Sequence, residues 1–106
     1  MKEFERKMVR AAIIETRNDI IGGIENSYLD YSEEEFIDLY NGRPTKESII
    51  NTIYRQLTSS KYIVLQNGLC VEAKHIKFLG KEKIMEMITE LVEKDIVRNN
   101  YEWLLG

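Results

Sequence analysis

The chain of 106 residues has one cysteine, one histidine and one proline, and these scarcities exclude several classes of site. A single cysteine, Cys70, cannot form a disulfide within the chain, which suits a reducing compartment, and we expect it to be a small buried residue. With His75 as the one histidine, a metal site that needs two histidines, such as HExxH, cannot form. No GxSxG, SxxK or carboxylate motif occurs. We therefore expect no enzymatic activity, no metal and no cofactor.

Long apolar runs are also missing. No stretch approaches the roughly 20 apolar residues that cross a bilayer, and the longest run without a charge, YIVLQNGLCV, has a turn in its middle. The first residues, MKEFERKMVR, are charged throughout, unlike a secretory signal. These features predict one cytoplasmic domain without membrane association, large enough to enclose a single core.

Charge is unevenly distributed along the chain, whose formal net charge is −3. Residues 1–42 hold five Lys/Arg and ten Asp/Glu, residues 43–83 hold eight and three, and residues 84–106 hold two and five. The middle segment is therefore positive, at +5, between acidic segments at −5 and −3. A positive middle can attract phosphate or an acidic partner. It can equally be neutralised by the acidic flanks of its own chain, and both possibilities stay open.

Four helices are predicted from apolar periodicity and capping residues. Helical spacing of apolar side chains predicts them over about residues 3–25, 33–41, 46–59 and 81–98. Ser32, with Glu35 three residues later, forms a capping-box pattern, and Thr45 is a good cap for the third helix. In the first helix, Gly22-Gly23 is expected either to end the helix or to allow another backbone to approach closely.

A β-hairpin is predicted between the third and fourth helices, with strands at 61–66 and 69–74. KYIVLQ and LCVEA are rich in β-forming residues, and Asn67-Gly68 between them is the preferred pair for a two-residue type I′ turn. The following KHIKFL either continues the second strand past a bulge or forms a separate extended piece. The predicted fold is therefore α+β and mainly helical, with three helices, a hairpin and a C-terminal helix in a single domain of residues 1–106.

The helix predicted at 46–59 has two distinct sides. Its apolar side predicts core and consists of Ile49, Ile50, Ile53, Tyr54 and Leu57. Its outward side lacks the glutamates found on the helix at 81–98 and instead has Ser48, Asn51, Thr52, Arg55 and Ser59. Small polar side chains and an arginine are the types that hydrogen-bond to base edges or to the surface of another protein.

The order helix, helix, turn, helix, hairpin resembles a winged helix-turn-helix domain over residues 4 to about 80. The resemblance implies that the third helix enters the major groove of DNA and that the hairpin contacts the DNA backbone or the minor groove. It further implies a set of nine DNA-binding residues, the polar ones at base edges and the basic ones near phosphates. These residues are Arg43, Lys46, Ser48, Asn51, Thr52, Arg55, Lys61, Lys74 and Lys77.

Two functions follow as expectations. The first is a non-enzymatic DNA-binding regulator of phage or mobile-element type, with duplex DNA as its partner, which could dimerise through the first helix or the tail YEWLLG. The second is a protein-binding inhibitor or adaptor of the same type, acting through an acidic, tyrosine-rich surface. Six tyrosines and Trp103 favour the second function, although Trp103 is also expected to fold back on the core.

Overall fold

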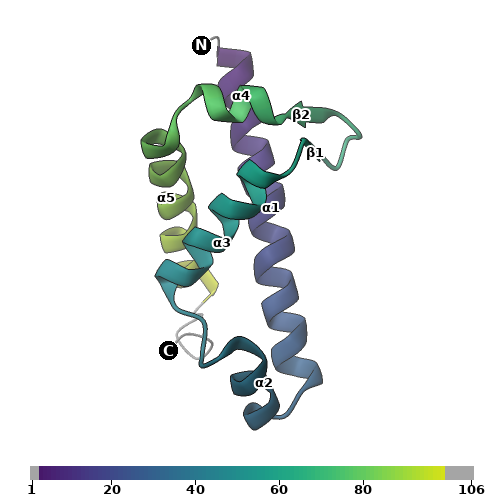
Figure 1. Cartoon of the computed structure of the whole chain (residues 1–106), viewed down its shortest axis with the longest axis vertical. Coiled ribbons are helices and arrows are strands. Elements are labelled where there is room, and N and C mark those ends of the chain that lie inside the picture. Colours follow the sequence, from purple (N-terminus) through teal and green to yellow (C-terminus); the bar gives the residue numbers. More distant parts are fainter. Residues whose placement is uncertain (1–2, 100–106) are drawn as a thin grey trace.

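The computed structural model describes residues 3–99, which form five helices and one two-stranded antiparallel hairpin (Figure 1). The elements are α1 (Glu3–Asp30), α2 (Glu33–Tyr40), α3 (Lys46–Ser59), β1 (Tyr62–Val64), β2 (Cys70–Glu72), α4 (Ala73–Phe78) and α5 (Lys81–Asn99). The fold is α+β and mainly helical, as predicted, and its element order is compatible with winged-helix topology. The tail at 100–106, with Trp103 and its predicted roles, lies outside the described residues.

Three helices enclose the core. α1, α3 and α5 pack on one another, while α2 lies at one end of α1 and the hairpin and α4 lie at the other end (Figure 1). Among the fully buried side chains are Ile13 of α1, Ile53 and Leu57 of α3, and Ile88 of α5. Removing one such side chain from water stabilises the fold by roughly 1.5–3 kcal/mol. The core therefore depends on side chains from three helices that are far apart in the sequence.

α1 is longer than predicted and contains Gly22-Gly23 in its interior. Both expected roles of the glycine pair are wrong, because the helix continues past it and a Cβ on either glycine would meet nothing within 4 Å. The following turns are held by packing: Ile24 is buried, and the Tyr28 ring lies edge-on to Phe36 of α2 with centroids 5.3 Å apart. This packing offsets the low helix propensity of the two glycines.

α2 and α3 begin at the caps that the sequence predicts. The Ser32 hydroxyl accepts a hydrogen bond from the Glu35 amide at 3.2 Å and donates to the Glu35 carboxylate at 2.9 Å. Thr45 accepts from the Ser48 amide at 3.1 Å, and the Ser48 hydroxyl accepts from the Thr45 amide at 2.8 Å. Local hydrogen bonds therefore fix where both helices start.

The hairpin strands are shorter than predicted, at Tyr62–Val64 and Cys70–Glu72. Ile63 and Val71 lie opposite each other in the ladder; Val71 is buried and Ile63 packs against the core. Because side chains alternate along a strand, the neighbouring Cys70 lies on the outward side, where it is exposed. The prediction that Cys70 is buried is therefore wrong.

The hairpin turn is a three-residue loop instead of the predicted type I′ turn at Asn67-Gly68. The Leu65 amide donates to the Leu69 carbonyl at 2.8 Å, which leaves residues 66–68 in the loop. A type I′ turn needs positive φ at both central residues, whereas of these two only Gly68 has one, at 86°. The Asn67 side chain instead accepts from the Leu69 amide at 3.1 Å, as asparagine often does in tight turns.

The segment KHIKFL belongs to a short helix, α4, so both extended interpretations of it are wrong. Ile76 is buried and Leu79, three residues later, packs against the core, which is helical spacing and not strand alternation. Gly80, at φ 87°, then donates its amide to the Lys77 carbonyl at 3.1 Å. The chain turns there into α5.

One partly buried ion pair joins α1 to α5. Arg17 Nη1 lies 3.1 Å from Asp95 Oδ2, and the two side chains are 19% and 12% exposed. Limited access of water strengthens the attraction between the charges, and it also makes either charge costly to leave alone. The pair therefore adds a specific polar contact to the apolar packing of the two helices.

Replacing Gly22 or Gly23 by alanine is expected to raise the free energy of unfolding by about 0.5–1 kcal/mol for each residue. The reason is that both positions are helical and have room for a Cβ. Urea unfolding followed by circular dichroism measures the change. A loss of stability in either variant would show that this position requires a glycine and does not tolerate a Cβ.

Replacing Asp95 by asparagine is expected to lower the free energy of unfolding by on the order of 2 kcal/mol, between the values for exposed and buried pairs. Lys94→Gln is the control, because the Lys94 ammonium lies 2.9 Å from Glu90 in an exposed pair, whose loss is expected to change the stability much less. Urea unfolding measures both variants, and equal losses would contradict a special role for the Arg17–Asp95 pair.

Candidate nucleic-acid interface

Packing leaves one strip of α3 at the surface. Ile49, Ile50, Ile53 and Leu57 are buried, which confirms the predicted apolar side of the helix. The exposed side chains of α3 are Glu47, Ser48, Asn51, Arg55, Gln56 and Ser59. Beyond its first turn, the exposed strip therefore has polar groups and an arginine but no carboxylate.

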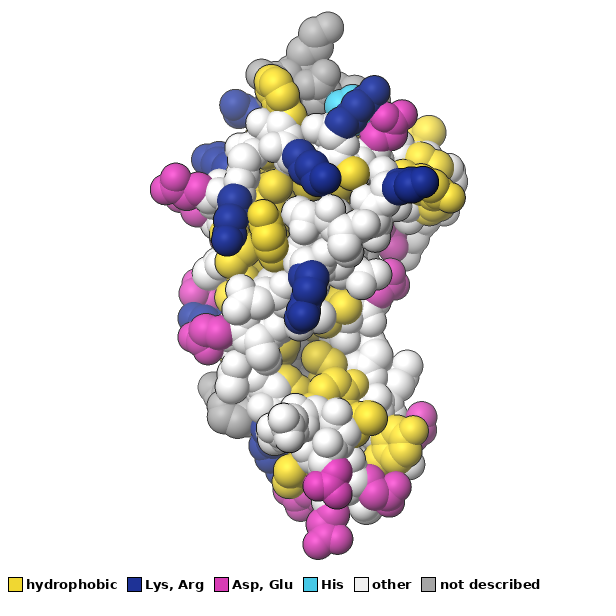
Figure 2. Space-filling view, viewed as in Figure 1, with side chains coloured by type: hydrophobic (Ala, Val, Ile, Leu, Met, Phe, Trp, Pro, Cys, Tyr) yellow, Lys and Arg dark blue, Asp and Glu magenta, His cyan; other side chains and the backbone are white. Residues whose placement is uncertain are grey.

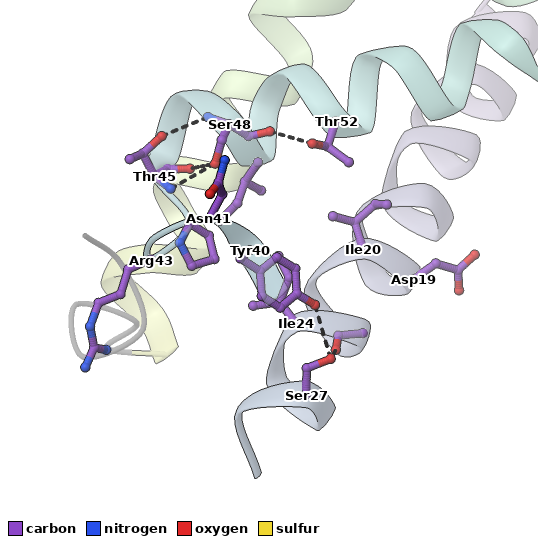
Figure 3. A pocket seen from close by; sticks show the side chains of 13 residues that line it. Asp19, Ile20, Ile24, Ser27, Tyr40, Asn41, Arg43, Thr45, Ser48 and Thr52 are labelled. Atoms are coloured by element: carbon purple, nitrogen blue, oxygen red, sulfur yellow. Dashed lines mark hydrogen bonds between the residues drawn. The ribbon is translucent and has the colours of Figure 1, made fainter. Parts of the chain in front are cut away.

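Two residues expected to contact base edges, Ser48 and Thr52, line a groove between α3 and α1 (Figure 3). The Ser48 hydroxyl belongs to the cap of α3, and the Thr52 hydroxyl donates to the Ser48 carbonyl at 2.7 Å. Both hydroxyls are thus engaged within the helix. Asn51 and Arg55 are exposed and make no side-chain hydrogen bond within residues 3–99, so they are the better candidates for base contacts.

Carboxylates of the flanking segments hold Arg43 and Lys46. Arg43 pairs with Glu33 of α2, and Lys46 Nζ lies 3.0 Å from Glu93 Oε1 of α5. This hydrogen bond and the negative charge of Glu93 raise the pKa of Lys46 above its ordinary value of 10.5. The start of the basic segment is therefore neutralised by the chain itself, which was one of the two possibilities left open by the sequence.

Lys74 is paired more weakly. Its ammonium lies 3.1 Å from Glu72, but the two side chains are 72% and 56% exposed. Exposed pairs of this kind contribute about 0–1 kcal/mol, so a phosphate group can compete with Glu72 for Lys74.

Four cations that have no ion-pair partner within residues 3–99 surround the C-terminal half of α3: Arg55, Lys61, Lys77 and Lys81. We term them the cationic surface. The Lys61 carbonyl accepts from the Ala73 amide at 2.9 Å, which places the base of the hairpin at the start of α4. The Lys81 ammonium lies 5.6 Å from the centre of the ring of Tyr54, the residue that precedes Arg55 in the sequence. Figure 2 shows Lys and Arg side chains spread over this end of the molecule.

Lys81 is absent from the set of nine residues predicted from the sequence. The resemblance ends near residue 80, so it assigns no role to the start of the last helix. The structure brings that start back to α3, where Lys81 lies over the Tyr54 ring. Its place in the net-positive segment was the one signal in the sequence that could have found it.

The opposite end of the molecule is acidic. Residues 18–42 contain seven Asp/Glu and no Lys or Arg, and Figure 2 shows acidic side chains gathered at the end where Figure 1 places α2. α2 is anchored on α1, because the Tyr40 hydroxyl donates to Ser27 Oγ at 3.1 Å and the Phe36 ring packs on Tyr28. Charge is therefore separated along the long axis, and the basic end is the one whose potential favours anions.

Neither a cluster of metal ligands nor a membrane-spanning helix is found among the described residues. Within residues 3–99, no three His, Cys, Asp or Glu side chains converge as metal ligands. No helix in the same range is both long and apolar enough to cross a membrane. Cys70 and His75 are each exposed, and the side chain of neither makes a hydrogen bond in this range.

Replacing Glu93 by glutamine is expected to bring the pKa of Lys46 back down toward 10.5, because the amide has no negative charge. Nitrogen-detected NMR titration of the lysine side chains measures this pKa. A lysine whose pKa is raised in the folded state contributes stability below its unfolded pKa, and the contribution is lost as pH rises through the raised value. An unchanged Lys46 pKa in the variant would contradict the pairing.

Comparison with known proteins identifies no relative: no protein-family model matches the chain, and no curated protein or solved structure matches it.

Proposed function

We propose that the protein is a small non-enzymatic regulator of phage or mobile-element type that binds duplex DNA through the exposed strip of α3 and the cationic surface. The observation that carries the proposal is the position of the four unpaired cations, which lie on α3, next to the hairpin, on α4 and at the start of α5. Unpaired cations are free to neutralise phosphates, and the counterions that they displace provide most of the affinity for DNA.

The exposed strip supplies groups that can read bases. Asn51 and Arg55 lie one helical turn apart on the same side of α3, and Gln56 and Ser59 are exposed beside them. Asparagine and glutamine pair with adenine, and arginine pairs with guanine, through two hydrogen bonds in the major groove. A helix that exposes asparagine, glutamine and arginine, with lysines on the neighbouring elements, suits the major groove of DNA, which is flanked by phosphates.

Arg43 and Lys46 have a smaller place in the proposal than the resemblance implied. DNA would have to displace Glu33 and Glu93 before either cation could bind a phosphate. Lys61 and Lys77 need no such exchange, and Lys74 needs only a weak one. The proposed phosphate contacts therefore move toward the hairpin and α4.

Binding to a random-sequence duplex, measured by fluorescence anisotropy, is expected to weaken steeply with salt. Four phosphate contacts correspond to a slope of about −3.6 for the logarithm of the binding constant against that of the salt concentration. Arg55→Ala is expected to weaken binding about tenfold at low salt and to make the slope shallower by about 0.9.

Arg98→Ala is the matched control for this experiment. Arg98 is exposed and lies on α5 about 26 Å from Lys81, at 1.5 Å per residue. At about 0.1 M salt, its loss is expected to leave the affinity within about twofold of the original value, since it is then more than two Debye lengths from Lys81. Absence of binding at low salt, or equal losses in the two variants, would contradict the proposal.

A further inference from the structure

A groove lies between α1 and the start of α3. It has a volume of about 680 Å³, and its apolar side chains are Ile20, Ile24, Tyr40, Pro44 and Ile49 (Figure 3). Ile24, Pro44 and Ile49 are buried, so they form its floor. In Figure 2, hydrophobic side chains are visible in the indentation between the basic and acidic ends.

Polar groups at the rim of the groove are largely engaged with one another. The Thr45 and Ser48 hydroxyls cap α3, the Thr52 hydroxyl donates to the Ser48 carbonyl, and the Tyr40 hydroxyl donates to Ser27 Oγ. Few free donors or acceptors remain to orient a polar small molecule, so the groove is better suited to apolar side chains.

The charge around the groove is one-sided. Asp19 lines it and has no ion-pair partner within residues 3–99, whereas Arg43, the one cation in the lining, is paired with Glu33. About half of the lining comes from the segment at 18–42, which has seven Asp/Glu and no Lys or Arg, and Asp19 is the carboxylate of this segment that lines the groove. An occupant with positive charge beside its apolar side chains would complement both properties.

We propose that this groove docks a basic amphipathic helix of a partner protein, with its apolar side on Ile20, Ile24 and Ile49 and its lysines or arginines facing the acidic segment. Helices commonly bind grooves in this way. A second copy of this chain fits less well, because a two-fold contact would place one acidic segment against another. The proposal does not rest on DNA binding, because the groove lies beside the start of α3, whereas the proposed phosphate contacts lie on the C-terminal half of α3, next to the hairpin, on α4 and at the start of α5.

Two neighbouring glycines allow a matched test. Gly23 lines the groove and Gly22 does not, yet a Cβ at either position meets nothing within 4 Å. Gly23→Leu therefore places a large side chain in the groove, while Gly22→Leu makes the same change of helix propensity outside it. Asp19→Lys reverses the unpaired charge at the rim.

The probe is a fluorescein-labelled helical 14-residue peptide of leucine and lysine, with leucines at positions i, i+3, i+4 and i+7. The control peptide is the same, except that glutamate replaces each lysine. The whole chain is expected to bind the lysine peptide at micromolar concentrations and the glutamate peptide at least tenfold more weakly. Gly23→Leu and Asp19→Lys are expected to weaken binding at least tenfold and threefold, respectively, and Gly22→Leu by less than twofold.

Circular dichroism checks that each variant keeps its helix content, and Asp19→Lys remains decisive should Gly23→Leu alter the fold. The proposal is overturned by absence of binding, by equal binding of both peptides, or by equal effects of the two leucine substitutions. Self-association in sedimentation velocity that Gly23→Leu abolishes would also overturn it, because a second copy would then occupy the groove.

Discussion

The architecture depends on burial of the apolar side of α3 against α1 and α5. Ile53 and Leu57 are fully buried, as are Ile13 of α1 and Ile88 of α5, and all four belong to one hydrophobic core. Once that side is inside, the geometry of a helix determines which residues face water. Burial of Ile49, Ile53 and Leu57 turns the other side of α3 toward water, and Asn51 and Arg55 lie on that side. The candidate interface is a consequence of the packing of the core.

Charge is separated along the long axis, so that one end of the molecule is basic and the other is acidic (Figure 2). At one end the cations of the cationic surface form no ion pair with a carboxylate of residues 3–99, and at the other end the segment at 18–42 contains no Lys or Arg. Between the ends, Arg43 of the segment between α2 and α3 forms an ion pair with Glu33 of α2, and Lys46 of α3 forms one with Glu93 of α5. The cations of the net-positive segment thus fall into two groups: Arg43 and Lys46 hold elements of the fold together, and those of the cationic surface have no ion-pair partner within residues 3–99. A small acidic protein can in this way present a phosphate-binding surface.

The parts of the fold predicted from sequence are those governed by local chemistry. Ser32 and Thr45 cap their helices through hydrogen bonds three residues away, and the isoleucines of α3 share one side because of helical spacing. Gly22-Gly23 was misjudged because the contacts that hold α1 beyond it, such as Tyr28 on Phe36, join segments that the local sequence does not connect. α4 was missed because a short apolar run fits strand and helix alike. At the candidate site, the pairing of Lys46 with Glu93 spans 47 residues, which no local pattern reveals.

The central claim is that DNA contacts the end of the molecule formed by α3, the hairpin and α4, and not the acidic end. Chemical-shift mapping of the nitrogen-15-labelled protein during titration with a duplex tests this most directly. The account predicts that shifts concentrate at the amides of residues 51–61 and 74–81, while those of α2, Glu33–Tyr40, stay unchanged. Shifts centred on α2, or spread evenly over both ends, would contradict it.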